Sequence, residues 1–421
     1  MTNPLALLPL AAAAGGGQLG DYEAQQLVAA GLTLLQRCAP LVRALNGRRS
    51  AILLPTTPAF LTALAASDGR GALVIRPVAS AAEIVTQCRA ATVGAVFTTT
   101  ALAGRVAGDL PCVLLDDAPR SARYVDRGTT RDVDLGSHHG LALEGEGDAP
   151  GRDEEAAVVY TSPIAGRPRG AVLSHRNLIA GARSTVLAAA NGADDHVLAM
   201  VPFAHHFGLT VSGMAPLFAG GRVTPMDRFA PSGAAELLVG GTITELVGTP
   251  AMYGSLLAAI ERRRGGVGEL RLCICGGAPL TRELQDRWFD TTGVELRNGY
   301  GRPEASPLCL FNRADRANVR GALGVPSPGV EVTIRMPRAE HGSLTAVLPV
   351  GTSGEICVRG DHVFTGYLDD GADGLAVRDG WLYTGDHGTM HGDGTVTLDG
   401  AMLPIGDRAG RRGLGHQREI P

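Results

Sequence analysis

The spacing of apolar residues divides the chain into three stretches. In the first stretch, segments with helical spacing alternate with short apolar runs that are typical of strands. The predicted helices cover 21–45, 59–66 and 81–91, and the predicted strands 51–54, 72–75, 94–98 and 112–115. This alternation predicts a first wound α/β subdomain over 1–155. Its polar, Gly-rich segment 116–156 is interpreted as a surface excursion.

The second stretch, 156–320, repeats the alternation. A strand over 156–160 is followed by a loop of small residues, and Ser174 caps a predicted helix that runs to about Ala189. A strand over 197–200 comes next, and helices and strands then alternate up to Gly301. These features predict a second α/β subdomain.

From residue 321 onward, short alternating runs are divided by Gly and Pro. This pattern predicts a β-rich subdomain over 321–400. Residues 401–421 are rich in Gly and Arg and are predicted to form a short tail. The predicted fold class is therefore α/β, with two wound α/β subdomains and a small β-rich subdomain.

Composition narrows the classes of partner and chemistry. A net charge of −4 gives no general attraction to nucleic acids or anionic lipids. All 38 basic residues are arginine, which excludes any mechanism that uses a lysine of this chain. The seven cysteines are scattered among apolar residues, which is typical of reduced core positions, and no apolar run reaches the ~18 residues of a membrane span. We expect a cytoplasmic protein with no nucleic-acid partner and no membrane span.

The segment 158–178 carries the strongest chemical signal, because a strand runs into a loop of small residues. Small residues let backbone N–H groups approach a phosphate, while hydroxyls and a cation contact its oxygens. The residues suited to these contacts are Thr161, Ser162, Gly166, Arg169 and Gly170. Pro163 removes an N–H donor from the loop, and Ile164 replaces a hydroxyl with an apolar side chain. We interpret the segment as an edited phosphate loop.

Five further blocks follow this loop in order: 201–210, 272–280, 298–304, 354–360 with 366–368, and 379–386. Together with the loop they resemble the large N-terminal lobe of acyl-adenylate-forming enzymes. This superfamily includes acyl-CoA synthetases, peptide-synthetase adenylation domains and luciferases. The resemblance spans nearly the whole chain, and the blocks around 202–210 and 276–280 are most similar to those of fatty or aryl acid CoA ligases.

The resemblance implies an ATP-dependent activation of a carboxylic acid. The carboxylate attacks the α-phosphate of ATP, which gives acyl-AMP and pyrophosphate, and a pantetheine thiol then displaces AMP. The implied cofactors are ATP and Mg²⁺, with CoA or carrier-protein pantetheine as the thiol acceptor. The implied partners are a fatty or aryl acid, a carrier protein, and a separate chain that supplies any missing part of the site.

The resemblance also implies roles for individual residues. Glu304 matches the metal-binding carboxylate, Asp386 the ribose-binding acid, and Arg169 the cation of the phosphate loop. The adenine is expected between two segments: Gly276, Gly277, Ala278 and Pro279 on one side, and Asn298, Gly299, Tyr300 and Gly301 on the other. His205 is expected to gate an acyl pocket lined by Phe207, Gly208, Thr249 and Pro250. Catalytic roles are expected for Glu304, Arg169 and His205.

Each of these residues, taken alone, also fits a purely structural role. Glu304 and Asp386 could be solvated loop acids, and His205 a core histidine with its hydrogen bonds made. The segment 276–279 could be no more than a strand end and a turn. The order of the blocks favours the nucleotide site over these explanations.

Four departures from the family pattern leave an alternative function open. Pro163, Ile164 and Ala165 replace loop hydroxyls, Pro303 replaces a threonine, and Ala401 stands where the family carries an arginine. The family's C-terminal lobe, with its catalytic lysine, is far longer than the 21 residues after residue 400. The alternatives are a catalytically degenerate binding or scaffold protein, an enzyme completed by another chain, and the product of a truncated gene.

Overall fold

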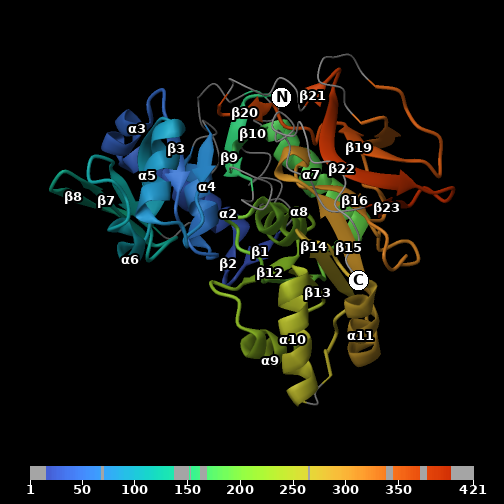
Figure 1. Cartoon of the computed structure of the whole chain (residues 1–421). Coiled ribbons are helices and arrows are strands. Elements are labelled where there is room, and N and C mark those ends of the chain that lie inside the picture. Colours follow the sequence, from blue (N-terminus) through green and yellow to red (C-terminus); the bar gives the residue numbers. More distant parts are fainter. Residues whose placement is uncertain are drawn as a thin grey trace, which may run out of the picture.

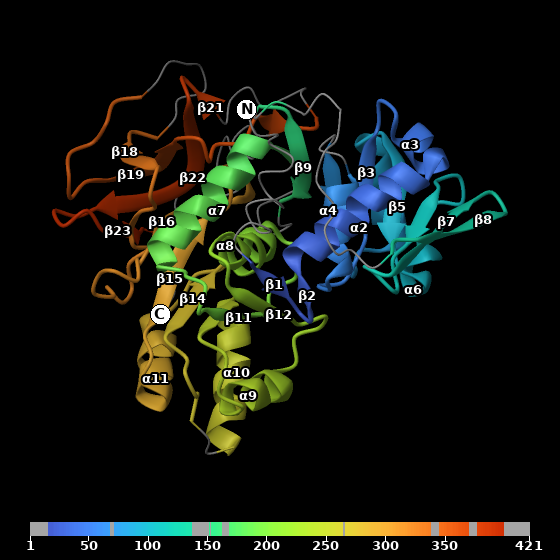
Figure 2. The same cartoon turned by 180° about the vertical axis from the view of Figure 1, so that it is seen from behind.

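The computed structural model describes residues 16–67, 71–136, 151, 153–161, 168–263, 266–337, 345–369 and 377–399. Their strands form three sheets (Figure 1); most strands of the first are blue to green, most of the second are yellow-green to orange, and those of the third are orange to red. The first and third sheets lie on opposite sides of the molecule, and the second lies between and below them. The view from behind shows helix α7 (His175–Ala189) running between the first and third sheets (Figure 2).

The first sheet has nine strands in the order β20-β10-β9-β4-β3-β5-β6-β7-β8. The strands from β9 to β6 are parallel, and antiparallel strands flank them on both sides. The bounds are β3 (Arg49–Ile52), β4 (Ala72–Val74), β5 (Val93–Thr98), β6 (Cys112–Leu114), β7 (Ser121–Asp126), β8 (Thr129–Asp134), β9 (Glu155–Tyr160), β10 (Gly170–Ser174) and β20 (Gly366–Tyr367).

The second sheet also has nine strands, in the order β17-β16-β15-β14-β13-β11-β12-β1-β2. The strands from β15 to β1 are parallel, so their carboxyl ends meet at one edge of the sheet. The bounds are β1 (Gln18–Leu19), β2 (Tyr22–Glu23), β11 (His196–Ala199), β12 (Arg222–Pro225), β13 (Glu245–Gly248), β14 (Leu272–Gly276), β15 (Leu296–Gly301), β16 (Leu308–Phe311) and β17 (Val325–Pro326).

The third sheet is antiparallel and has five strands. Its central strand is longer than any other strand of the three sheets, and Asp386 lies near the middle of that strand. The bounds are β18 (Glu331–Arg335), β19 (Ser353–Arg359), β21 (Val377–Arg378), β22 (Trp381–Met390) and β23 (Val396–Leu398).

Helices cover the sheets and begin where the sequence supplies caps. Ser174 accepts a hydrogen bond from the Asn177 N–H and starts α7, and Ser80 caps α5 in the same way with Glu83. The helices are α2 (Ala24–Arg37), α3 (Ala39–Leu45), α4 (Ala59–Ala66), α5 (Ala81–Ala90), α6 (Thr100–Ala103), α7, a π-helical segment η2 (Gly208–Met214), α8 (Ala215–Phe218), α9 (Pro231–Val239), α10 (Pro250–Arg263), α11 (Arg282–Thr292) and a 3₁₀ turn η3 (Pro303–Ala305).

The interpretation of 116–156 as a surface excursion was wrong for residues 121–134. These residues form the hairpin β7–β8, which extends the first sheet. Arg127 and Gly128 join its strands with φ angles of 44° and 83°, the left-handed conformation of a tight hairpin turn. Tyr124 and Val133 are buried in the first core, while most other side chains of β8 are exposed, which is why the segment looks polar in sequence.

The predicted α/β class, with two wound layers and a β-rich part, is confirmed by the three sheets. The sheets do not follow the three sequence segments, because β1 and β2 join the second sheet while β9, β10 and β20 join the first. The subdomain limits 1–155, 156–320 and 321–400 stay predictions. The tail 401–421 lies outside the described residues.

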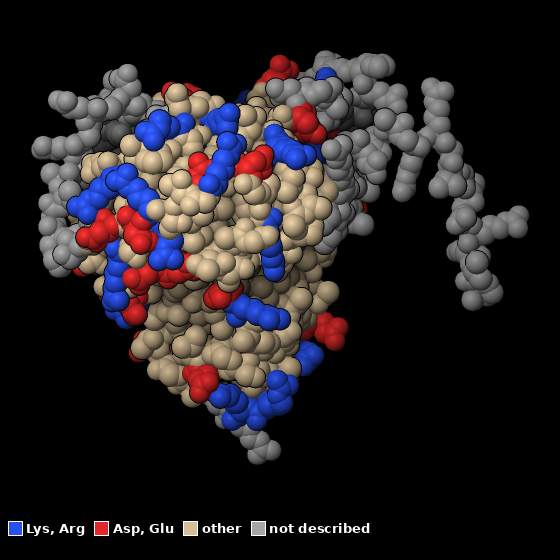
Figure 3. Space-filling view, turned by 90° about the vertical axis from the view of Figure 1, so that its left-hand side faces the viewer, with Lys and Arg blue, Asp and Glu red and all other residues tan. Residues whose placement is uncertain are grey.

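Other sequence expectations have direct structural counterparts. All seven cysteines are buried and unpaired. Among the described residues, no single helix has the length and hydropathy to cross a bilayer; α2 and α3 pass such a test only when joined across a 91° bend, and their apolar residues pack in the first core. Acidic and basic side chains are interspersed over the described part of the face seen in Figure 3.

Candidate functional site

The residues of the predicted adenine site lie at the carboxyl ends of parallel strands β14 and β15. Gly276 is the last residue of β14, and Gly299 pairs with it in β15. A Cβ on Gly276 would lie only 2.7 Å from the carbonyl oxygen of Gly299, and one on Gly301 would lie 1.6 Å from that of Pro307. Gly277 has a φ of +80°, which favours glycine. The glycines are therefore required by the close approach of the backbone.

These two segments face a narrow pocket. It is lined by all the predicted adenine residues except Gly276, together with two leucines, in the set Gly277, Ala278, Pro279, Asn298, Gly299, Tyr300, Gly301, Leu323 and Leu398. The lining is more apolar than polar, with backbone at both walls. A flat aromatic ring is the kind of ligand that fits between glycine-rich segments of this shape.

A second pocket adjoins the first and shares its glycines. It is lined by His205, His206, Phe207, Gly277, Gly299, Gly301, Arg302, Pro303, Pro307 and Leu308. His205 faces the open side of this recess, whereas His206 is buried in its wall. Burial by surrounding protein lowers the pKa of both rings, that of His206 to about 3, and the nearby Arg76 lowers that of His205 further. Both histidines are therefore neutral at pH 7.

Asp386 is buried beside the adenine pocket and accepts two hydrogen bonds. The Tyr300 hydroxyl donates to Asp386 Oδ2 at 2.6 Å, and Arg302 donates to the same oxygen at 2.8 Å. Burial and the charge of Asp386 hold the pKa of Tyr300 well above its usual value, so its hydroxyl remains a donor. Asp386 Oδ1 has no hydrogen-bond partner among the described residues. This oxygen is the one left for a ligand hydroxyl.

Glu304 is also buried, and each of its carboxylate oxygens already faces another side chain. The Tyr367 hydroxyl donates to Glu304 Oε1 at 2.6 Å, and Arg302 Nε lies 3.9 Å from Oε2. Among the described residues, no group of three His, Cys, Asp or Glu side chains is placed to hold a metal. A guanidinium that faces the same carboxylate repels a second cation. The residues present do not fit a divalent ion at Glu304.

The predicted phosphate loop is described only at its two ends. Thr161 and Arg169 close its base, because the Arg169 N–H donates to Thr161 Oγ1 at 3.0 Å and the Thr161 N–H donates to the Arg169 carbonyl at 2.9 Å. The Arg169 guanidinium lies over the Tyr367 ring, 3.6 Å from its centroid, and pairs with Asp369 at 3.2 Å. Ser162 and Gly166 lie outside the described residues.

Four other predicted residues line neither of these two pockets. Thr249 directly follows β13, and its methyl group lies 3.8 Å from where a Cβ of Gly277 would be; Pro250 is the first residue of α10. Gly208 begins η2 against the carbonyl of Pro202, and Gly170 begins β10 against Leu368. Both are explained by close packing, because a Cβ would lie 2.2 Å and 2.7 Å from those neighbours.

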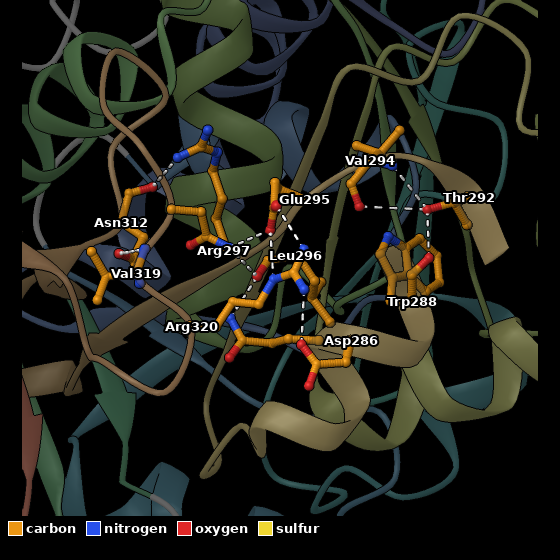
Figure 4. A network of polar contacts seen from close by, with 12 residues as sticks. Asp286, Trp288, Thr292, Val294, Glu295, Leu296, Arg297, Asn312, Val319 and Arg320 are labelled. Atoms are coloured by element: carbon orange, nitrogen blue, oxygen red, sulfur yellow. Dashed lines mark hydrogen bonds and ion pairs between the residues drawn. The ribbon is translucent and has the colours of Figure 1, made fainter. Parts of the chain in front are cut away.

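The strand that carries Asn298 is fixed from outside by a polar network (Figure 4). Arg297 donates to the carbonyl oxygens of Asn312, Arg313 and Arg316 and holds the following loop against β15. Arg320 pairs with Glu295 at 2.7 Å and with Asp286 at 2.8 Å. On the inner side, Asn298 Nδ2 donates to the Ala322 carbonyl at 3.1 Å. The Arg297 and Arg320 contacts hold the outer side of β15 and the loop after β16, and only the Asn298 contact lies at the adenine pocket.

Sequence reasoning assigned no role to three residues that the structure places at the site. Arg302 and His206 line the second pocket, and Tyr367 holds Glu304. Arg302 and Tyr367 stand inside recognised sequence blocks, but Arg302 meets Asp386 across 84 residues. The sequence shows an arginine two residues before Glu304, but it does not show that this side chain is buried, because burial depends on distant contacts.

Comparisons with known proteins place this site in a family. The model of the AMP-binding enzyme family matches residues 36–368. The chain is 33% identical over 246 residues to a feruloyl-CoA synthase of an Amycolatopsis species, covering 58% of this chain and 49% of the relative. It is also 33% identical over 246 residues to a long-chain-fatty-acid–CoA ligase of Bacillus subtilis, covering 57% and 42%. The chain thus spans about half the length of the curated relatives it matches.

A solved structure supports the same assignment. The ATP-bound structure of MatB from Rhodopseudomonas palustris superposes with a TM-score of 0.73 at 25% identity, covering 91% of this chain and 75% of MatB. The expected fold of the large lobe and the expected resemblance are both confirmed. With its ordered blocks, its paired pockets and a family match over most of its length, the chain belongs to the AMP-binding enzymes of the acyl-adenylate-forming superfamily.

Proposed function

We propose that the chain binds an adenine nucleotide at the carboxyl edge of the second sheet and activates a carboxylic acid there as an acyl-adenylate. The observation that carries this proposal is the pair of adjoining pockets, which share Gly277, Gly299 and Gly301. One pocket suits an aromatic base beside a buried acid. The other is lined by His205 and Phe207 and suits the acyl group, so the α-phosphate would lie where the two meet.

The residues divide the work in this arrangement. Asp386 Oδ1 accepts a ribose hydroxyl, and the glycine-rich walls hold the adenine. The carboxylate oxygen of the acid attacks the α-phosphorus, the bond to the pyrophosphate oxygen breaks, and pyrophosphate leaves. Arg302, which lines the second pocket next to the shared Gly301, offsets the charge that develops on the phosphoryl oxygens. The neutral His205 borders the acyl pocket without adding charge.

Support for the acid class comes from the relatives. They include a feruloyl-CoA synthase and a long-chain-fatty-acid–CoA ligase, so an aryl or a fatty acid is the substrate class we propose. Transfer of the acyl group to the thiol of CoA, or of a carrier protein, is the second step of this proposal. A separate chain that completes the site belongs to the same proposal.

One observation favours a second candidate function, that of a binding protein that no longer adenylates. Arg302 and the two tyrosines already occupy one oxygen of each acid, and Pro303 stands beside Glu304 without a hydroxyl or an N–H to donate. A site whose acids are held by these contacts could bind a nucleotide or an acyl-adenylate without catalysing its reaction.

Calorimetric titration with ATP, AMP and a non-hydrolysable acyl-adenylate analogue tests the proposal, with Asp386→Ala as the site variant and Asp132→Ala, on the outer hairpin of the first sheet, as an exposed control. We expect binding that Asp386→Ala weakens by at least about tenfold while the control leaves it unchanged. Pyrophosphate release across aryl and fatty acids then separates the enzyme from the binding protein. Absence of binding by all three ligands would refute both candidates.

A further inference from the structure

Arg302 lies between the two acids that the nucleotide site is expected to use. Its guanidinium donates to Asp386 at 2.8 Å and lies 3.9 Å from Glu304, and only 6% of its side chain is exposed. Burial alone would lower the pKa of Arg302, but the charges of Glu304 and Asp386 raise it above its usual value. The arginine is thus a permanent positive charge enclosed by two acids.

The tyrosines leave each acid with one held oxygen and one open oxygen. Tyr300 and Arg302 hold Oδ2 of Asp386, and Tyr367 holds Oε1 of Glu304. Asp386 Oδ1 and Glu304 Oε2 are buried and make no hydrogen bond to a described residue. Two buried carboxylates thus share one cation, which makes Arg302 the element that balances their charge.

Arg302 is also placed to meet a ligand. It lines the second pocket next to Gly301 and Pro303. A guanidinium has five N–H donors, and Arg302 uses one of them on a described residue. The two histidines of this pocket are neutral, so Arg302 is the positive charge among the described residues that line it.

A divalent ion at Glu304 would meet this positive charge across the same carboxylate. Mg²⁺ needs oxygen ligands at close range in an octahedral arrangement. Glu304 offers Oε2 for that purpose, and Arg302 already faces this oxygen. The arginine and the ion therefore compete for one electrostatic position.

We propose that Arg302 takes the place of the divalent metal ion as the counter-charge of the nucleotide phosphates, so that ATP binds this site equally well without Mg²⁺. The proposal rests on the proposed nucleotide site and adds to it a charge-positioning residue. Arg302 holds Asp386 in place for the ribose with one N–H and directs the remaining donors toward phosphoryl oxygens. Its planar fork suits bidentate contacts to such oxygens.

The test is calorimetric titration of the full chain with ATP, once with millimolar MgCl₂ and once with EDTA. We expect the two dissociation constants of the wild-type protein to agree within about threefold. Arg302→Lys keeps a cation and should preserve this agreement. Arg302→Met frees Glu304 for a metal, so its ATP affinity should fall at least about tenfold in EDTA and recover with MgCl₂.

A matched control is Arg320→Met, which removes an arginine shared by two acids outside both pockets (Figure 4). It should leave the wild-type behaviour unchanged. Circular dichroism establishes that each variant is folded, and the wild-type comparison decides the question if Arg302→Met is not. Wild-type binding of ATP in MgCl₂ but not in EDTA would overturn the role of Arg302 and leave the proposed function standing. Absence of ATP and AMP binding under both conditions would overturn both.

Discussion

Two clusters in this protein contain the same parts, one arginine and two buried acids, at opposite ends of the second sheet. At the strand starts, Arg271 makes a bidentate pair with Asp195 at 2.7 and 2.6 Å, and Glu245 is fully buried nearby. Beyond the strand ends, Arg302 is shared by Asp386 and Glu304. The first cluster lines neither nucleotide-site pocket, whereas in the second Arg302 lines one pocket and Asp386 is bonded to Tyr300, which lines the other.

The difference lies in how the acids are satisfied. In the strand-start cluster, Asp195 also accepts from the Thr244 hydroxyl and the Gly192 N–H, and Glu245 accepts from Asn191. Burial raises the pKa of Glu245 to about 8, so this carboxyl is neutral at pH 7 and leaves one full ion pair. In the strand-end cluster one cation serves two acids, and each acid keeps an oxygen without a hydrogen bond; in the strand-start cluster only the neutral Glu245 does so. The same residues build a fixed structural pair in one place and a receptive site in the other.

The largest expected effect comes from removing each arginine. Arg302→Met leaves two buried acids unpaired and should lower the free energy of unfolding by about 3–5 kcal/mol. Arg271→Met should cost less, about 2 kcal/mol, because 39% of the Arg271 side chain is exposed and the buried Asp195 keeps hydrogen bonds from Thr244 and Gly192. Urea unfolding of both variants measures the two losses. Equal losses would contradict the claim that the clusters differ.

The next effect concerns pH and the strand-start cluster alone. The folded-state pKa of Glu245 is raised to about 8, above that of glutamate in the unfolded chain. As pH rises from the unfolded pKa toward 8, keeping the buried carboxyl protonated costs more, so the free energy of unfolding falls. Glu245→Gln should therefore raise the free energy of unfolding by about 3 kcal/mol at pH 8 and by almost nothing at pH 4. Urea unfolding at both pH values checks this. A gain of the same size at both would show that the burial of the charge is not its cause.

A smaller effect separates two tyrosines. Tyr300 donates to Asp386 in the site, and Tyr253 donates to the carbonyls of Leu246 and Ile274 in the second core. Replacement of either by Phe should cost about 1 kcal/mol of stability. Only Tyr300→Phe should also weaken ATP binding, by about fivefold, in calorimetric titration. Unchanged ATP affinity in Tyr300→Phe would remove Tyr300 from the site.

The smallest effect is expected in the network of Figure 4. Arg320 pairs with two acids, but these acids are 47% and 30% exposed. Arg320→Met should lower the free energy of unfolding by about 0.5–1 kcal/mol and leave ATP affinity unchanged. Thermal unfolding and titration measure both quantities. A clear loss of ATP affinity would mean that this network acts on the adenine pocket.

Elements with a local signal could be predicted from the sequence. Helix α4 was predicted at its observed bounds, and the Ser174 cap fixed the start of α7, because spacing and capping are properties of neighbouring residues. The hairpin β7–β8 was missed because its outer strand is almost wholly exposed and carries few apolar residues. The Arg127–Gly128 pair between two alternating runs could have indicated a hairpin turn.

The site divides in the same way. Glycines and acids in ordered blocks could be recognised from sequence, and the structure brings Gly277, Tyr300 and Asp386 together. The joining of Arg302 to Asp386, or of Tyr367 to Glu304, depends on contacts between residues 84 and 63 positions apart. The first pair follows from the packing of the third sheet against the second, and the other from the packing of β20 of the first sheet against the second, which no local pattern encodes.

A crystal structure of the protein soaked with ATP in the absence of divalent metal tests the central claim most directly. We expect adenine between the 277–279 and 298–301 segments, a ribose hydroxyl on Asp386 Oδ1, and Arg302 still on Oδ2 with its other donors on phosphoryl oxygens. Nucleotide bound elsewhere, or at this edge with Arg302 turned away from both acids and phosphates, would contradict it.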